Sequence, residues 1–307
     1  MKDEYGTSDH SSDEHTDGTL DTAVVKTPDV PFPRGTTPAE ALRRPWYVDH
    51  GYLLGGWTDG DILEAFGTAF YVYVSGNISA TLASYGIRQT GAYTGIGNMA
   101  LLSLFIYATS SSTGGHLNPL VTFSAIFAGV LPVSKGILYL LGQALGGALG
   151  GGVLTGVYGN GLSIQVRGSG CYYDPSVISS GQVFLNELFA SLAYLFLSYG
   201  VGLDPKQGLL FGPRLAPLLA GSCLGLVTFA TSGALPGYTG AQMNPARCFG
   251  FGIARRDMSG QWIWWFAPAA AGLVLAFLFN FAPLHGGEKD AGGRRHVKPS
   301  GRKLGSA

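Results

Sequence analysis

Six long apolar segments alternate with polar stretches along the 307-residue chain. A membrane-spanning helix needs about 20 predominantly apolar residues, and each segment has about that length. We predict spanning helices at 60–84, 95–113, 133–158, 181–203, 214–235 and 260–283. Two shorter apolar stretches, 118–129 and 244–254, begin with Asn-Pro. At roughly 1.5 Å per residue each reaches only about halfway across a bilayer, so we predict two half-helices.

The order of these features repeats along the chain. Glu64 lies early in the first span and Glu187 early in the fourth; Asn118 follows the former by 54 residues and Asn244 follows the latter by 57. Because each half has three spans, the second half enters from the opposite side, as in an inverted-topology repeat. The predicted fold is therefore an all-α membrane protein with six transmembrane helices and two re-entrant half-helices. The repeat halves are 58–158 and 181–284.

The charges divide the chain into a membrane domain and two tails. Residues 50–285 hold only 15 of the 38 Asp, Glu, Lys and Arg residues. We expect a disordered cytoplasmic tail at 1–45, a channel domain at 46–285 and a basic cytoplasmic tail at 286–307. With both ends inside, fourteen Lys and Arg residues face the cytoplasm and four face outward, as the positive-inside rule favours. The zero net charge excludes nucleic acid as a partner.

The two Asn-Pro pairs carry the candidate chemistry. Asn is a good N-cap and Pro suits the first helical position, so each pair predicts a helix start with a partial positive charge. If both starts meet at the midplane, they repel cations, and the two Asn amides donate to a passing oxygen. The expected midplane residues are Asn118, Pro119, Leu120, Asn244, Pro245 and Ala246.

The loops before the half-helices predict a ladder of backbone acceptors. Irregular backbone at membrane depth is tolerated where it lines a cavity, and exposed carbonyls can replace a solute's hydration. The expected carbonyls are those of Gly114, Gly115, His116 and Gly240. Charged residues inside spans are rare and usually functional. We interpret Glu64 and Glu187 as buried acceptors for the loop N–H groups; interfacial glutamates near helix starts are the alternative.

Arg247 lies three residues after Asn244, on nearly the same helix face. It is expected to project toward the outer mouth and to oppose cations there; a structural ion pair is the alternative. Glycines crowd the third span, including 146, 147, 150, 151, 152 and 156. They predict close helix–helix approach.

Gly114-Gly115-His116-Leu117-Asn118-Pro119 and Asn244-Pro245-Ala246-Arg247 resemble the two signature loops of the major intrinsic protein family, the aquaporins and glycerol facilitators. The resemblance covers about 58–284 and implies one pore per subunit and a homotetramer. We expect the protein in the plasma membrane. Leu120 departs from the family's usual Ala, which puts the usual pore width in doubt. Cys248 makes the second motif similar to the X intrinsic proteins of plants and fungi, as does Cys171 in a long outer loop; the tail fits a fungal member. Whether Cys171 pairs is left open.

The resemblance also implies a selectivity filter of Asn98, Thr231, Ala241 and Arg247, with Ser232 as the alternative to Thr231. These side chains are small or medium where water-selective members carry Phe and His. They imply a wider, polar filter for glycerol, hydrogen peroxide, urea or boric acid, with water slow; a water-selective aquaporin is the alternative. No cofactor or metal is expected. Two further alternatives are an ion-coupled transporter and a membrane enzyme with His116 and the serines at 110–112.

Overall fold

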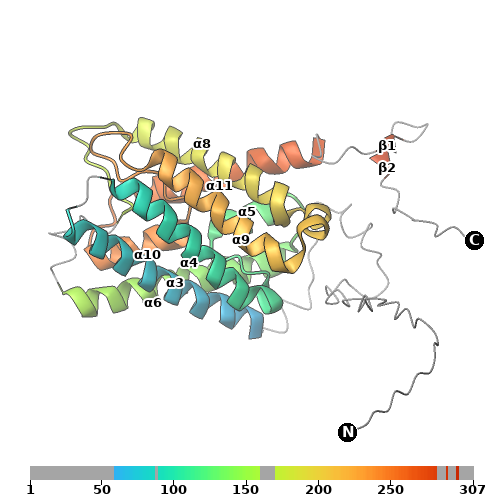
Figure 1. Cartoon of the computed structure of the whole chain (residues 1–307), viewed down its shortest axis with the longest axis horizontal. Coiled ribbons are helices and arrows are strands. Elements are labelled where there is room, and N and C mark those ends of the chain that lie inside the picture. The colour runs from blue at the N-terminus through green and yellow to red at the C-terminus, as the bar shows by residue number, and fades with distance from the viewer. Residues whose placement is uncertain (1–58, 87–88, 160–169, 282–287, 290–294, 297–307) are drawn as a thin grey trace, which may run out of the picture.

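The structure is a computed structural model that describes residues 59–86, 89–159, 170–281, 288–289 and 295–296. The tail predicted at 1–45 lies outside these residues, as does most of 286–307. Within the latter, β1 (Glu288–Lys289) pairs antiparallel with β2 (Arg295–His296). The described body is a bundle of long helices that run side by side (Figure 1).

The helices follow the predicted order. They are α3 (Asp59–Ser84), α4 (Thr90–Thr113), α5 (Pro119–Phe127), α6 (Val133–Tyr158), α8 (Ser180–Ser198), η1 (Tyr199–Leu203), α9 (Pro205–Thr231), α10 (Pro245–Arg255) and α11 (Gln261–Phe281). Among the described residues, five helices are long and apolar enough to cross a membrane. The one predicted span outside these five is the first, α3. It has 26 residues and a more polar start at Asp59, Asp61 and Glu64.

The predicted boundaries differ from the structure at two spans. The second span starts at Thr90, five residues before the prediction. The fifth starts at Pro205 rather than 214, and it includes a break at Gly212, where φ is 66° and ψ is 172°. Because Pro213 follows and has no N–H to donate, the regular part of α9 begins close to the predicted position.

The two halves pack with the symmetry expected of an inverted repeat. In the first half α3 packs along α6, and in the second α8 packs along α11. Each half-helix contacts the last span of the other half, α10 against α6 and α5 against α11. The second spans, α4 and α9, pack along one another. The half-helices are therefore held between the two repeats.

Glycines on α6 allow two of these contacts. A Cβ at Gly150 would lie 2.6 Å from the carbonyl oxygen of Ala69 on α3. On the adjacent face, a Cβ at Gly151 would collide with the carbonyl oxygen of Gly250 on α10. Gly146 and Gly147 make matching contacts with α3 and α10. The predicted helix-packing role is wrong for positions 152 and 156, because a Cβ there meets nothing within 4 Å.

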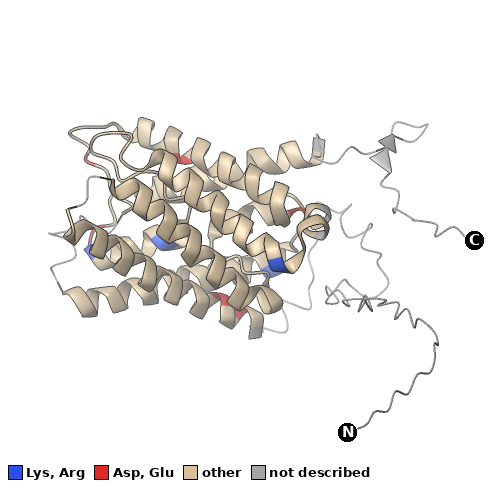
Figure 2. Ribbon diagram, viewed as in Figure 1, with Lys and Arg blue, Asp and Glu red and all other residues tan. Residues whose placement is uncertain are grey.

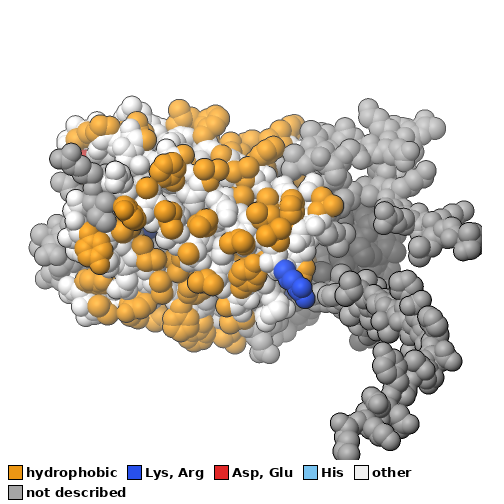
Figure 3. All heavy atoms as spheres, viewed as in Figure 1, with side chains coloured by type: hydrophobic (Ala, Val, Ile, Leu, Met, Phe, Trp, Pro, Cys, Tyr) orange, Lys and Arg blue, Asp and Glu red, His pale blue; other side chains and the backbone are white. Residues whose placement is uncertain are grey.

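The outer surface of the bundle is apolar. Few charged residues lie along the helices (Figure 2), and apolar side chains spread over the long face of the molecule (Figure 3). Large exposed side chains include Phe66, Phe70, Leu145, Phe189 and Phe277. A contiguous apolar surface of this kind suits contact with lipid.

We expect Gly151→Ala to destabilise the protein, because its methyl group would force α6 away from α10. Overpacking of this kind typically costs about 1–3 kcal/mol. Gly152→Ala is the matched control on the same helix, and it should be neutral or slightly stabilising because alanine is the better helix former. Melting temperatures in detergent compare the two. Equal melting temperatures would contradict the close α6–α10 contact.

Candidate functional site

The starts of the two half-helices are joined by reciprocal hydrogen bonds. Asn118 Nδ2 donates to Met243 O at 2.8 Å, and Asn244 Nδ2 donates to Leu117 O at 3.1 Å. Each Asn Oδ1 caps its own helix, accepting from Leu120 N at 2.9 Å and from Arg247 N at 3.1 Å. A side-chain amide has two N–H donors, so each Asn keeps one beyond these bonds.

The residue before each Asn adopts the same unusual backbone conformation. Leu117 has φ of 49° and Met243 has φ of 53°. These values lie in the left-handed region, which residues other than glycine seldom adopt. Such residues cost on the order of 1–3 kcal/mol and persist where the surroundings hold them. Both side chains are fully buried. The two left-handed turns present the carbonyls that the opposite Asn amides bind.

The Glu64 carboxylate accepts hydrogen bonds from the first loop and its surroundings. Its Oε1 accepts from His116 N at 3.0 Å and Thr113 Oγ1 at 2.8 Å. Its Oε2 accepts from Leu117 N at 2.8 Å and Gln143 Nε2 at 2.9 Å. The carboxylate is fully buried on α3, so these four bonds replace the water that a charged group needs.

Glu187 does the same for the second loop. Its Oε1 accepts from Gln242 N at 2.8 Å and Tyr238 Oη at 2.6 Å, and its Oε2 accepts from Met243 N at 3.1 Å. The two carboxylates therefore bind equivalent backbone positions, one and two residues before each Asn. The interfacial alternative is wrong, because both glutamates are fully buried.

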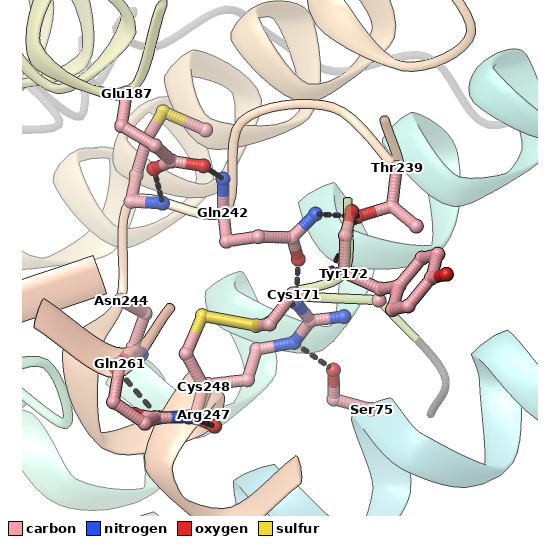
Figure 4. Close-up of a disulfide and its surroundings, with 12 residues drawn as sticks. Ser75, Cys171, Tyr172, Glu187, Thr239, Gln242, Asn244, Arg247, Cys248 and Gln261 are labelled. Atoms are coloured by element: carbon pink, nitrogen blue, oxygen red, sulfur yellow. Dashed lines mark hydrogen bonds between the residues drawn. A yellow bond between two sulfur atoms is a disulfide. The ribbon is translucent and has the colours of Figure 1, made fainter. Parts of the chain in front are cut away.

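Arg247 lies on α10 and is 4% exposed. We call this end of the bundle outer, following the orientation predicted from the sequence. Its Nε donates to Ser75 Oγ at 2.5 Å and its Nη2 to Ser79 Oγ at 3.4 Å, both on α3. Its Nη1 donates to Gln242 Oε1 (Figure 4). The guanidinium also lies 4.4 Å from the ring centroid of Phe251. Its hydrogen-bond partners in the described part of the chain are neutral, so no direct ion pair there compensates the positive charge of the buried guanidinium.

Beside Arg247 is an outer cavity of about 520 Å³. Of the four predicted filter residues, only Arg247 lines it. Thr228 and Ser232, the predicted alternative, line it from α9 and the turn that follows. Asn98 is buried and donates to Thr228 Oγ1 at 3.5 Å.

Thr231 and Ala241 belong to the wall behind this cavity. The Thr231 hydroxyl donates to Val227 O at 2.9 Å and accepts from Ala241 N at 3.2 Å. It thus points at backbone groups and joins the end of α9 to the second loop. Because Thr231 lies within α9, its hydroxyl bonds the carbonyl one turn back, as threonine side chains in helices often do. Neither residue lines the outer cavity.

The predicted carbonyl ladder differs between the two loops. Gly114, Gly115 and Gly240 have φ values of 82°, 69° and 91°, a conformation that glycine adopts readily. The Gly240 carbonyl already accepts a bond from Gln242 Nε2 at 2.7 Å. It keeps one lone pair for another donor. His116 turns its ring into the protein, where Nδ1 lies 3.1 Å from Thr122 Oγ1.

The other midplane positions are fully enclosed. Leu120 and Ala246 have no exposed surface. Leu120 belongs to the apolar core that includes Leu101, Leu102 and Met243. The larger side chain at position 120 is thus taken up by core packing.

A disulfide joins the outer loop to the second half-helix. Cys171 and Cys248 have a Cα–Cα distance of 5.3 Å and are 77 residues apart in sequence. Arg255 Nη1 donates to the carbonyls of Gly170 at 3.1 Å and Cys171 at 3.0 Å. The chain at 170–171 therefore lies directly over Arg247 (Figure 4).

Sequence reasoning noted both cysteines but left their pairing open. It also passed over Gln143, Gln242, Tyr238 and Thr228. The signal for the disulfide was present, because Cys248 directly follows Arg247 at the outer mouth and Cys171 lies in the outer loop. Cys171 was expected outside, and disulfides persist on the oxidising side of a membrane.

We expect reduction of this disulfide to lower the melting temperature of the protein. In the chain-entropy account, a cross-link over 77 residues contributes about 4 kcal/mol. The double variant Cys171→Ser, Cys248→Ser should melt lower and no longer respond to reductant. Cys223→Ser, which alters the buried free cysteine, should keep the response. A wild-type melting temperature unmoved by reductant would contradict this role.

Comparison with known proteins agrees with this geometry. Residues 60–279 match the major intrinsic protein family. The chain is 29% identical over 227 residues to a probable aquaporin TIP-type alpha of Phaseolus vulgaris, covering 72% of this chain and 84% of that protein. It is 30% identical over 230 residues to aquaporin TIP2-2 of Zea mays, covering 71% and 85%.

A solved structure gives the same fold. The aquaglyceroporin from Plasmodium falciparum superimposes with a TM-score of 0.60 at 20% identity, covering 72% of this chain and 95% of that one. The family match spans more than two thirds of the chain, and the paired half-helices described above lie within it. The chain therefore belongs to the major intrinsic protein family, and it is a membrane channel and not an enzyme.

Proposed function

We propose that the protein is a passive channel for small uncharged solutes, such as glycerol, hydrogen peroxide, urea or boric acid, with slower passage of water. The observation that carries the proposal is the pair of opposed helix starts, joined by Asn118 and Asn244, with Arg247 at the outer end. The two helix starts and Arg247 each place positive potential along one path. Such a path favours neutral, oxygen-bearing solutes and excludes cations and protons.

The state of the two glutamates favours a channel over an ion-coupled transporter. A transporter would use a carboxylate to bind its coupling ion. Glu64 accepts four hydrogen bonds and Glu187 accepts three, all from the protein. With their lone pairs engaged in this way, both serve the loops and not an ion.

The residues around the outer cavity support a polar filter. Thr228 and Ser232 offer hydroxyl groups to the cavity beside Arg247, and the buried Asn98 donates to Thr228 Oγ1. Hydroxyl-bearing solutes are recognised by groups that can both donate and accept. A water-selective channel is the second candidate, and the aquaporin names of the similar plant proteins favour it.

We further propose that both ends of the chain are cytoplasmic and that the protein is a homotetramer of the plasma membrane. The Cys171–Cys248 disulfide supports this orientation, since disulfides persist on the oxidising side of a membrane. Exposed apolar side chains on the helices supply surface for lipid and for neighbouring subunits. Cys248 and the acidic, Ser-rich tail support a fungal member of the X intrinsic proteins.

The first test is solute permeation through purified protein in liposomes, followed by stopped-flow light scattering. The wild type should pass glycerol or urea faster than empty liposomes do. The variant Thr228→Phe should lower that rate, because a bulky ring would fill part of the cavity beside Arg247. Passage of water alone by the wild type would contradict the polar filter and favour the second candidate.

The second test concerns charge exclusion. Proton flux into wild-type liposomes, read with a pH-sensitive dye, should equal that of empty ones. Arg247→Ala should raise cation or proton leakage, since it removes the positive charge at the outer end. Arg256→Ala removes an exposed charge nearby and is the control. Proton flux through the wild type above that of empty liposomes would contradict the proposed exclusion of protons.

A further inference from the structure

We propose that Gln242 is a specificity-determining residue that narrows the outer mouth and sets the size of solute admitted. The inference rests on the proposed function and concerns the same path. Gln242 lies between Ala241 and the half-helix start at Asn244. Its side chain lines the outer cavity together with Arg247, Ser232 and Thr239.

The backbone of Gln242 is fixed, which determines where its side chain emerges. Gln242 N donates to Glu187 Oε1 at 2.8 Å, and the next residue, Met243, donates to the other carboxylate oxygen at 3.1 Å. The loop therefore cannot rotate Gln242 away without leaving a buried carboxylate short of a partner, which is costly. From this fixed position the side chain extends toward Arg247 (Figure 4).

The amide is held at both of its atoms. Oε1 accepts from Arg247 Nη1, while Nε2 donates to Gly240 O at 2.7 Å and lies 3.4 Å from Thr239 Oγ1. The side chain thus bridges a donor and an acceptor that both border the cavity. A solute hydroxyl could use that same pair, because it donates and accepts at once. In the wild type the protein's own amide occupies them.

The other nitrogens of Arg247 are also engaged. Nε donates to Ser75 Oγ and Nη2 to Ser79 Oγ. With Gln242 Oε1 and, at 3.9 Å, Cys171 Sγ on Nη1, each guanidinium nitrogen has a protein partner, and one hydrogen of Nη2 remains for a solute. Gln242 therefore reduces both the width of the mouth and the number of donors that a large solute meets.

The outer loop closes the remaining side. A Cβ at Gly170 would lie 3.1 Å from Gln242 Oε1 and 3.5 Å from both terminal nitrogens of Arg247. This backbone is fixed by the disulfide at the next residue, Cys171. The Gln242 amide is thus enclosed between Arg247, Gly240 and the chain at 170–171. It cannot swing outward to admit a larger solute.

The test compares Gln242→Ala with Gln242→Met in liposomes, using glycerol and water permeability per reconstituted folded protein. Gln242→Ala should raise the ratio of glycerol to water permeability several-fold, because it removes the bridging side chain. Gln242→Met restores most of the volume without the hydrogen bonds, so its ratio should fall between those of Gln242→Ala and the wild type. Gln182→Ala is the matched glutamine control, since the side chain of Gln182 bonds Ser179 at the start of α8 and does not line the outer cavity.

Three outcomes distinguish the two proposals. A ratio in Gln242→Ala equal to that of the wild type and Gln182→Ala would overturn the role of Gln242 while leaving the channel function in place. A ratio in Gln242→Met as high as in Gln242→Ala would also overturn it, because the volume of the side chain would then not matter. If neither the wild type nor Gln242→Ala exceeds empty liposomes for any neutral solute, both proposals fail.

Discussion

The structure depends on one constraint, which is that a loop inside a membrane must find partners for its backbone N–H groups. Water is absent there, and each unsatisfied group costs several kcal/mol. Glu64 and Glu187 meet this demand from the first span of each half, each binding the two N–H groups before an Asn. Their charge is stabilised by the same bonds that satisfy the loops. Every other feature of the path follows from loops held in this way.

Once the loops are fixed, the two halves lock together at the centre. The left-handed turns at Leu117 and Met243 aim one carbonyl of each loop at the Asn of the other. Glycines on α6 then let α10 approach closely enough for this contact to form. Local backbone strain, a buried charge and a glycine face are thus parts of one arrangement, because none is stable without the others.

The sequence predicted the parts of the structure that repeat. Asn118 and Asn244 with their prolines, and the glutamates before them, occur twice at similar spacing, so the half-helices and their anchors could be found without coordinates. The residues of the selectivity filter were harder to predict from the sequence. Thr231 was placed by counting along a loop, and the last turn of α9 instead directs its hydroxyl to Val227 and Ala241. The position equivalent to Gln242 in the first half holds His116, whose side chain differs, so the repeat did not indicate the role of Gln242. The roles of Gln242 and of the Cys171–Cys248 pair depend on contacts between distant segments.

The placement of Arg247, Gln242 and the Cys171–Cys248 disulfide at one end of the bundle has a consequence for permeation in the two directions. Arg247, Gln242 and the disulfide all lie at one end of a path whose centre is nearly symmetric, so the barrier that we propose there is off-centre. In a passive pore this asymmetry cannot drive net transport, because the forward and reverse rates over one barrier balance when the two concentrations are equal. It determines instead at which point along the path a solute is selected. Under the proposal, a molecule entering beside Arg247 is selected first, whereas one entering from the opposite end crosses the midplane before it is selected.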